Sequence, residues 1–261
     1  MTDRIYRVDD GGTERHVIER DAVVAWLEGG LFGGYRAGRE IARVERPGVL
    51  PAGFRILAPL VPSKIVGVGL NYRDHAAEIG KPVPTEPLIF IKPSTAVIGA
   101  GQPIRIPPGT GRVDHEAELA VVIGKRAWRV PRERAAEFIF GITCANDVTA
   151  REMQRRGVQY SHCKGYDTFA PLGPCIAVGL DGSARQVEGW VNGERRQASN
   201  SREMIFPIDE LVAYISSVMT LLPGDVISTG TPAGIAPLRP GDTVTVKVEG
   251  VGELTNPVME G

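Results

Sequence analysis

Short apolar runs, separated by glycine and proline, are the feature of this chain that most restricts its fold. The 261 residues include 32 glycines and 20 prolines, which suits many short strands joined by turns better than long helices. Residues 117–124 are apolar and rich in β-branched side chains, which is typical of a buried strand. Strands do not alternate regularly with helices as they do in a doubly wound sheet. We therefore predict an α+β fold that is mainly β.

The hydrophobic pattern also predicts where the individual elements lie. Asn192-Gly193 between two apolar runs predicts a tight hairpin. Residues 207–222 carry one apolar stripe with the spacing of a buried helix face. Its members are Ile208, Leu211, Val212, Ile215, Val218, Met219 and Leu222. Shorter helices are predicted at 71–80, 131–138 and 148–156, and further strands at 4–8, 15–19, 64–70, 88–92, 175–178, 186–191, 244–248 and 254–258.

The character of the sequence changes near residue 62. The preceding segment has two short polar strand candidates and a glycine-rich stretch, and then prolines at Pro47, Pro51, Pro59 and Pro62. We interpret residues 1–62 as a small N-terminal subdomain with a connector. Residues 63–261 then form the main domain.

Composition and charge exclude several classes of protein. Lys and Arg number 30 against 31 Asp and Glu, so no overall positive field would hold nucleic acid or an anionic membrane. No apolar run approaches the roughly 20 residues that span a bilayer, and the charged N-terminus lacks the apolar stretch of a signal peptide. The three cysteines, Cys144, Cys163 and Cys175, are widely spaced and fit reduced thiols. We therefore expect a cytoplasmic protein without nucleic-acid or membrane partners.

Glu116 and Glu118 are the first candidate metal ligands. On a strand they would project from the same face, at the start of an otherwise apolar run. Two neighbouring carboxylates repel each other, and a divalent cation offsets both this repulsion and the cost of burial. Carboxylate oxygens favour hard ions such as Mg²⁺, Mn²⁺ or Ca²⁺ over zinc. A solvated strand end with two surface glutamates remains the simpler alternative.

Asp147 is a third acid at the end of another apolar run. We expect it at or near the N-cap of the helix predicted at 148–156. Arg151 and Gln154 follow at spacings of four and seven, along one helix face. Three acids ringed by Arg and Gln would suit a cation with an anionic, oxygen-rich ligand. Helix capping alone is the alternative for Asp147.

His75 and Glu78 are candidate acid–base groups. Three residues apart on a helix, they share a face, so Glu78 can orient the imidazole. Such a pair can act as a general base near neutral pH, although an exposed His–Glu pair has the same spacing.

Lys92, Lys164 and residues 229–234 are candidate anion-binding groups. Both lysines could bind carboxylates or simply lie on the surface. The segment Thr229-Gly230-Thr231-Pro232-Ala233-Gly234 resembles an anion nest built from backbone N–H groups and hydroxyls. A Gly/Pro turn between strands is the alternative for this segment.

Together these segments resemble the fumarylacetoacetate hydrolase family over about residues 63–258. The matching motifs, in order, are Val68-Gly69-Leu70-Asn71-Tyr72 with His75 and Glu78; Phe90-Ile91-Lys92-Pro93-Ser94; His115-Glu116-Ala117-Glu118-Leu119; Asn146-Asp147-Val148-Thr149-Ala150-Arg151 with Gln154; Lys164-Gly165 with Asp167; Gly173-Pro174; Val191-Asn192-Gly193-Glu194; Pro223-Gly224-Asp225; and Thr229-Gly230-Thr231-Pro232. One such motif would be weak evidence, whereas nine in the same order are specific.

The resemblance implies a mixed β-sheet roll in residues 63–261, a catalytic domain that usually forms a homodimer. It implies a Mg²⁺ or Mn²⁺ site at Glu116, Glu118 and Asp147, with Ca²⁺ as a substitute ion. It also implies an acid–base pair, His75 and Glu78, on a mobile lid. Further implied roles are polarisation of the substrate or proton transfer by Lys164, and binding of substrate oxygens by Lys92, Arg151, Gln154, Gly230 and Thr231.

The reaction that the resemblance implies starts from a 2-oxo acid with a further carbonyl or enol group. Its 2-oxo acid end would chelate the metal, which lowers the cost of an enolate at C3. Within the family, this chain resembles the 2-hydroxyhepta-2,4-diene-1,7-dioate isomerases of aromatic catabolism and the acylpyruvate hydrolases. An oxaloacetate-type decarboxylase is the second alternative because all three reactions share the enolate. A non-catalytic carboxylate-binding homologue is the alternative from another class.

Overall fold

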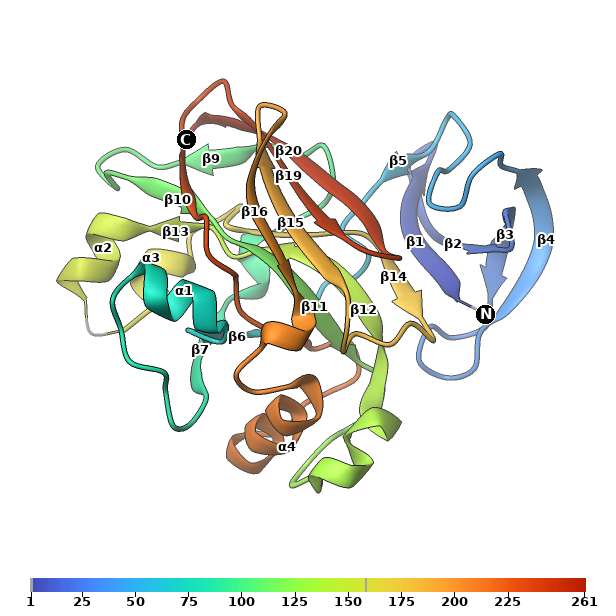
Figure 1. Cartoon of the computed structure of the whole chain (residues 1–261). Helices are drawn as coiled ribbons and strands as arrows, with labels where there is room; N and C mark the ends of the chain where they lie inside the picture. The colour runs from blue at the N-terminus through green and yellow to red at the C-terminus, as the bar shows by residue number, and fades with distance from the viewer. Residues whose placement is uncertain (1, 158) are drawn as a thin grey trace.

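Hydrogen-bonded β-strands make up most of the protein, as the short apolar runs predict (Figure 1). The structure is a computed structural model that describes residues 2–157 and 159–261. Its large mixed sheet runs in the order β4 (Arg36–Arg43), β3 (Val23–Glu28), β2 (Thr13–Arg20), β1 (Asp3–Asp10), β14 (Ala170–Val178), β12 (Ile139–Asn146), β11 (Ala117–Ile123), β17 (Val226–Ser228), β6 (Ile65–Gly69) and β7 (Leu88–Lys92). β5 (Arg55–Ile56) pairs with β1, and β8 (Val97–Ile98) pairs in parallel with β14.

Two smaller sheets complete the β structure. One runs in the order β16 (Glu194–Asn200), β15 (Gln186–Val191), β19 (Thr243–Val248), β20 (Gly252–Glu260) and β9 (Ile104–Ile106). The other consists of β13 (Thr149–Ala150), β10 (Val113–His115) and β18 (Ala236–Leu238). The α-helices are α1 (Arg73–Glu78), α2 (Arg151–Arg156), α3 (Ser161–Lys164) and α4 (Ile208–Val218), and the 3₁₀ helices are η1 (Ser94–Ala96), η2 (Arg132–Phe138) and η3 (Ser201–Glu203). The predicted mainly β, mixed-sheet α+β fold is thereby confirmed.

Strand β11 lies inside the molecule and is buried along its whole length, as its apolar sequence predicts. Because side chains alternate along a strand, its residues enter two different cores. Leu119 and Val121 pack in the core that includes residues of α4 and β19, whereas Ala120 and Val122 pack with β6 and β17 on the other face. Glu118 lies on the same face as Ala120 and Val122, so burial of the strand carries this carboxylate into the interior.

The hairpin predicted at Asn192-Gly193 joins β15 and β16, and both turn residues have positive φ, at 52° and 79°. This is the backbone conformation that the Asn-Gly pair favours in a two-residue turn. The half-buried alternation of β19 is likewise as predicted.

The N-terminal strands continue the large sheet through antiparallel pairing of β1 with β14. Figure 1 shows them as a blue group beside the remaining strands. The division near residue 62 stays a prediction.

Two predicted helices differ from the observed ones. The segment at 131–138 is a 3₁₀ helix, in which the Arg134 N–H donates to the Pro131 carbonyl three residues back. The helix predicted at 207–222 ends at Val218, and Met219 is extended. Leu221 instead exchanges backbone hydrogen bonds with Ala127. Val218 and Leu222 are consequently 57% and 41% exposed, not part of the buried face.

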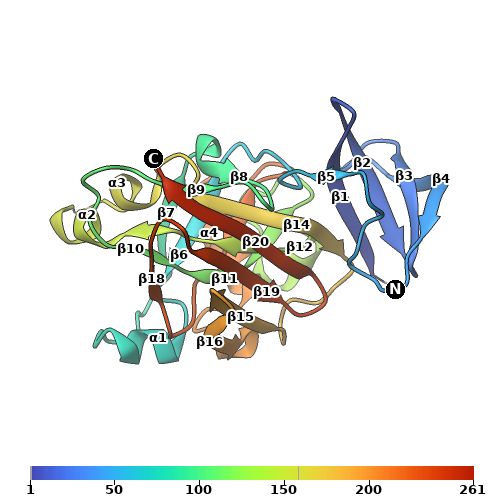
Figure 2. The same cartoon turned by 90° about the horizontal axis from the view of Figure 1, so that it is seen from above.

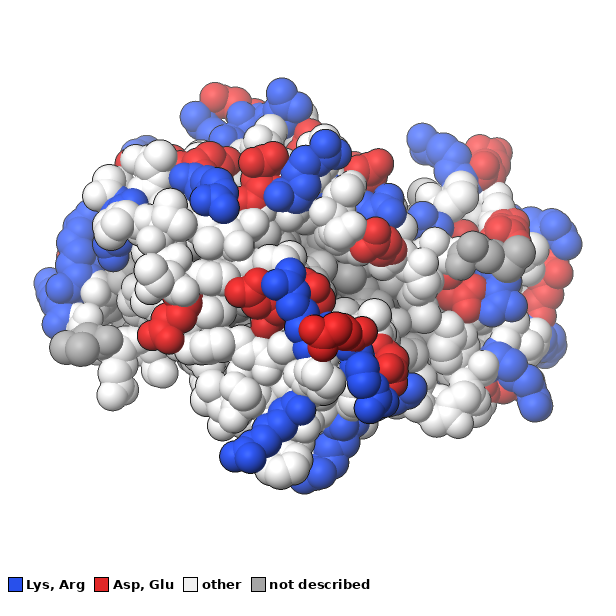
Figure 3. Space-filling view, turned by 60° about the horizontal axis from the view of Figure 1, so that its bottom comes forward, with Lys and Arg blue, Asp and Glu red and all other residues white. Residues whose placement is uncertain are grey.

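Helices α1, α2 and α3 gather at the end of the molecule away from β1–β4, and the two views agree on this (Figures 1 and 2). On the face drawn in Figure 3, positive and negative side chains are interspersed. Among the described residues, none of the helices has the length and apolarity to cross a membrane.

Candidate active site

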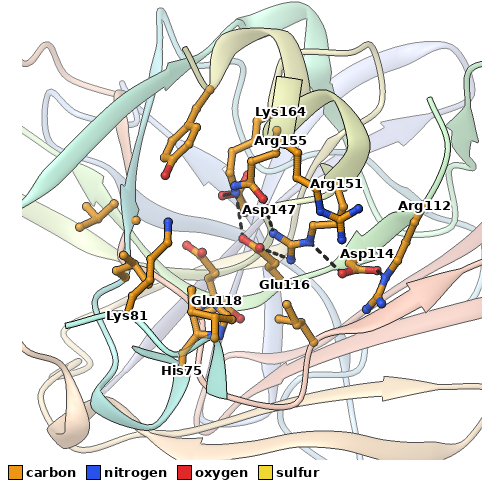
Figure 4. Close-up of a pocket in the computed structure, with 18 of the residues that line it drawn as sticks. His75, Lys81, Arg112, Asp114, Glu116, Glu118, Asp147, Arg151, Arg155 and Lys164 are labelled. Carbon is orange, nitrogen blue, oxygen red and sulfur yellow. Dashed lines mark hydrogen bonds and ion pairs between the residues drawn. The ribbon is translucent and has the colours of Figure 1, made fainter. Parts of the chain in front are cut away.

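A cavity of about 670 Å³ opens beside α1, α2 and α3 and is lined by charged side chains (Figure 4). Eight of the eleven residues singled out in the sequence line it: His75, Glu116, Glu118, Asp147, Arg151, Gln154, Lys164 and Thr231. The other three, Glu78, Lys92 and Gly230, do not line it but bond to residues that do. The fold thus brings together groups that are far apart along the chain.

Three carboxylates meet at the floor of this cavity. One oxygen from each of Glu116, Glu118 and Asp147 lies within 4.8 Å of the others, and all three residues are buried. The antiparallel register places Ala117 opposite Asn146, so Glu116 and Asp147 stand at the same end of β11 and β12. The Asp147 N–H donates to the Glu116 carbonyl at 2.9 Å, which holds the two segments together.

The expected position of Asp147 at a helix N-cap is wrong. Ala150 precedes the first residue of α2, and the short strand β13 separates Asp147 from the helix. Pairing of Thr149 with Asp114 in the small sheet keeps this segment extended. The Asp147 side chain is therefore free of capping and accepts hydrogen bonds from Lys92 and Lys164.

The surroundings shift the pKa values of Glu116 and Glu118 in opposite directions. Burial raises the pKa of Glu118 to about 8, and the neighbouring charges of Asp147 and Glu116 add to this effect. Burial also acts to raise the pKa of Glu116, but the cations Lys164 and Arg151 outweigh it and hold that pKa well below its ordinary value. Glu118 is the carboxyl of this group that lacks a bonded cation, since Ser228 and Gly230 donate only neutral hydrogen bonds to it.

This donor set fits a hard divalent cation. Three carboxylates share one small volume, and burial together with the charges of Asp147 and Glu116 raises the pKa of Glu118. Mg²⁺ and Mn²⁺ bind through carboxylate oxygens of this kind and would relieve the repulsion. Glu116, Glu118 and Asp147 are thus the residues that could hold the ion.

The affinity for Mn²⁺ is expected to rise about tenfold per pH unit between about pH 6 and pH 8, because the ion must displace the Glu118 proton. Without metal, the same proton makes folding stability fall as pH rises, since the folded-state pKa lies above the unfolded value of 4.5. Mn²⁺ should therefore raise the melting temperature more at about pH 8 than at about pH 5.5. Titration calorimetry and thermal unfolding measure both effects. A pH-independent affinity would contradict the assignment of Glu118.

His75 and Glu78 make the contact that their spacing predicts. His75 Nδ1 and Glu78 Oε2 are 2.9 Å apart on α1, and the imidazole is buried. Glu78 Oε1 accepts a hydrogen bond from the Gly234 N–H at 2.9 Å, which orients the carboxylate. Because Nδ1 is engaged, Nε2 is the nitrogen left for the cavity.

The two lysines differ in position. Lys164 lines the cavity and donates to Glu116, Asp147 and the Thr149 hydroxyl. Burial works against its charge, but Asp147 and Glu116 outweigh it and raise its pKa above the ordinary value. Lys92 lies behind Asp147 and also donates to the Phe169 carbonyl at 2.6 Å. Burial, together with the Lys164 charge, lowers the pKa of Lys92 despite Asp147.

The turn at 229–234 binds an anion, but the anion is a side chain of the protein. The Gly230 N–H and the Ser228 hydroxyl both donate to Glu118 Oε2, at 3.0 Å and 2.5 Å. Thr231 lines the cavity, donates to the Ala117 carbonyl and accepts from Gln197. These bonds place the turn as a support for the acidic cluster.

Arg151 bonds to three other side chains that line the cavity. It donates to Asp114 at 2.8 Å, to Glu116 at 2.5 Å and to Gln154 at 3.0 Å. Asp114 also accepts from Arg112 at 2.7 Å. A rigid, charged wall therefore stands beside the three acids.

Four further charged residues line the cavity that the sequence motifs do not mark: Lys81, Arg112, Asp114 and Arg155. A signal existed for Asp114, which shares the two-residue spacing of Glu116 and Glu118 and is also buried. Lys81, Arg112 and Arg155 lie in polar segments with no such pattern, and only the folded chain brings them to the cavity.

Comparisons with known proteins agree with this geometry. The family model described as fumarylacetoacetate (FAA) hydrolase C-terminal matches residues 64–259. A crystal structure of 5-carboxymethyl-2-hydroxymuconate delta-isomerase from Mycobacterium smegmatis is 44% identical, with a TM-score of 0.88 over 99% of this chain and 100% of that one. The 2-hydroxyhepta-2,4-diene-1,7-dioate isomerase from Mycobacterium marinum is 38% identical, with a TM-score of 0.88 over 98% of each chain.

A third solved structure carries a metal. Maleylpyruvate hydrolase from Sphingobium sp. SYK-6, in complex with manganese(II) and pyruvate, is 27% identical, with a TM-score of 0.78 over 99% of each chain. The family model covers most of this chain, and both isomerases match it along nearly its full length. The chain therefore belongs to the fumarylacetoacetate hydrolase family.

Proposed function

We propose that this protein is a Mg²⁺- or Mn²⁺-dependent enzyme that acts on 2-oxo acids with a second carbonyl or enol group. The observation that carries the proposal is the convergence of Glu116, Glu118 and Asp147 at the floor of a cavity large enough for a small substrate. The manganese and pyruvate in the related maleylpyruvate hydrolase support this choice of ion and of ligand class. The names of the two isomerase relatives support an unsaturated 2-hydroxy acid as the substrate, and we place the reaction in aromatic catabolism.

The cavity residues have distinct tasks in this reaction. An ion held by Glu116, Glu118 and Asp147 would act as a Lewis acid, stabilising negative charge on the 2-oxo oxygen. Arg151 and Gln154 bind and orient the carboxylate of the substrate beside it. Lys164 helps to keep Glu116 ionised, bonds to Asp147 and stands ready to donate a hydrogen bond to the substrate.

His75 and Glu78 perform the proton transfer. Glu78 accepts from Nδ1 and stabilises the cation that forms when Nε2 takes a proton. In hydrolysis, Nε2 removes a proton from water, whose oxygen attacks the distant carbonyl. The C3–C4 bond then breaks, its electron pair forms the enolate, and the proton returns to C3. In isomerisation, Nε2 would move a proton between carbons of the same substrate.

His75→Gln is expected to lower kcat by about 10²- to 10⁴-fold, because glutamine cannot accept a proton near neutral pH. The decay of enol absorbance of an acylpyruvate with Mn²⁺ measures this effect. The exposed His162 offers a matched control, and His162→Gln should keep wild-type turnover. Full activity of His75→Gln, with Mn²⁺ affinity intact, would assign the proton transfer to another group.

Two other functions would use the same cavity residues. An oxaloacetate-type decarboxylase would use the same acids and form the same enolate by loss of CO₂. A non-catalytic carboxylate-binding protein would need only the metal cluster and Arg151. A panel of acylpyruvates, the unsaturated seven-carbon dioate and oxaloacetate, assayed with Mg²⁺ and Mn²⁺, separates the reactions, and binding without turnover would favour the last alternative.

We propose a cytoplasmic homodimer, with a small-molecule acid as its only ligand besides the metal. The three cysteines are unpaired and buried, which agrees with a reducing compartment. The interspersed charges on the face in Figure 3 give no support to nucleic-acid binding. Light scattering during size-exclusion chromatography measures the oligomeric state.

A further inference from the structure

Arg155 is an exposed cation that lines the cavity, and the described residues provide no counter-charge for it. It lies four residues after Arg151 on α2, so the two guanidinium groups share one helix face. Figure 4 shows both side chains extending from α2 on the same side of the acidic residues. Arg151 bonds to Asp114 and Glu116, whereas Arg155 makes no side-chain hydrogen bond or ion pair within 2–157 and 159–261.

The acid on α2 pairs with the neighbouring Arg156 and not with Arg155. Arg156 pairs with Glu152 at 3.7 Å, and its side chain is 69% exposed. Arg156 does not line the cavity, while Arg155 does. Arg151 already bonds to Asp114 and Glu116, so Arg155 is the guanidinium group of this helix face that remains, among the described residues, for an anion that enters the cavity.

The charges of the residues that line the cavity also favour an anionic ligand. Four carboxylates line it, Asp114, Glu116, Glu118 and Asp147, against five permanent cations, Lys81, Arg112, Arg151, Arg155 and Lys164. A divalent ion adds two further positive charges. By this count a substrate with one carboxylate would leave an excess of two positive charges, and a dioate an excess of one.

We propose that Arg155 binds a second carboxylate, at the end of the substrate distant from the metal, so that the enzyme selects dioic over monocarboxylic 2-oxo acids. This inference rests on the proposed function and narrows its substrate class. A guanidinium group presents parallel N–H donors that match a carboxylate. Lys81 is also unpaired among the described residues, but Figure 4 shows it across the acidic cluster from Arg151 and Arg155.

Binding of matched acids to the Mn²⁺-loaded protein tests the proposal without need of turnover. The pairs are 2-oxoadipate with 2-oxohexanoate, and 2-oxopimelate with 2-oxoheptanoate, which differ only in the terminal carboxylate. Titration calorimetry of the wild type should show about tenfold tighter binding of the dioate in at least one pair, as a charge-assisted pair provides. Arg155→Gln should reduce this preference to about threefold or less, and Arg156→Gln should leave it as in the wild type.

Four outcomes would overturn the assignment of Arg155. A wild-type preference near one, an unchanged preference in Arg155→Gln, or no binding of either acid would reject the second-carboxylate site. Loss of the preference in Lys81→Gln but not in Arg155→Gln would move the site to the other wall. Turnover of acylpyruvates without the dioate preference would reject the subsite and keep the proposed function. A dioate preference without turnover of any 2-oxo acid would keep the subsite and reject the proposed function.

Discussion

Glu116→Gln is expected to abolish metal-dependent turnover while the protein stays folded. The substitution removes one of the three carboxylates that could hold the ion. Changes to residues that only support a metal ligand already lower metal affinity by about 10- to 100-fold, so loss of a ligand should lower it by at least about a hundredfold. Mn²⁺ titration calorimetry and the acylpyruvate assay measure the two losses.

The fold should survive because the partners of Glu116 keep other acids. Lys164 still bonds to Asp147, and Arg151 still bonds to Asp114. Glu152→Gln is the matched control, since that side chain is 44% exposed and does not line the cavity. Wild-type turnover of Glu116→Gln at saturating Mg²⁺ would remove the acidic cluster from the mechanism. Unfolding of the variant, seen by circular dichroism, would redirect the test to Glu118→Gln.

Leu119→Ala is expected to cause a large loss of stability, lowering the free energy of unfolding by about 2–5 kcal/mol. Leu119 is fully buried in β11, and its side chain packs in the core shared with Ile142. Truncation removes apolar contacts and leaves a cavity that two paired neighbouring strands prevent from collapsing. For a chain of this length the melting temperature should fall by roughly 10 °C.

Leu222→Ala provides the control for Leu119→Ala. Leu222 is 41% exposed, so the same truncation there should cost less than about 1 kcal/mol. Urea unfolding followed by tryptophan fluorescence gives both values. Equal losses at the two positions would mean that β11 is not the centre of the cooperative core.

A strand was predictable from the sequence where almost all of its residues are apolar, because such a run indicates a buried strand. The run of β11 admits no other state because every side chain from Ala117 to Ile123 is apolar except Glu118. The hairpin at Asn192-Gly193 was predictable because its backbone conformation depends on the two turn residues themselves.

Helix ends were less predictable because tertiary pairing competes with helix formation. The apolar stripe continues to Leu222, but the chain leaves the helix at Met219 to pair Leu221 with Ala127. The N-cap expected at Asp147 failed for the same reason, since β13 pairs with β10 before α2 begins. Local patterns cannot report a hydrogen-bonding partner that is distant in the sequence.

The sequence by itself determined the residue types of the candidate site and the mainly β architecture, because short-range alternation and motif order are local properties. Only the tertiary structure decided which groups meet. The register of β11 with β12 brings Asp147 to Glu116, and pairing with Asp114 fixes Arg151 beside them. Whether a charged side chain is buried, paired or free depends on those long-range contacts. Lys92 is buried and bonds to Asp147, whereas Arg155 lines the cavity and has no side-chain partner among the described residues.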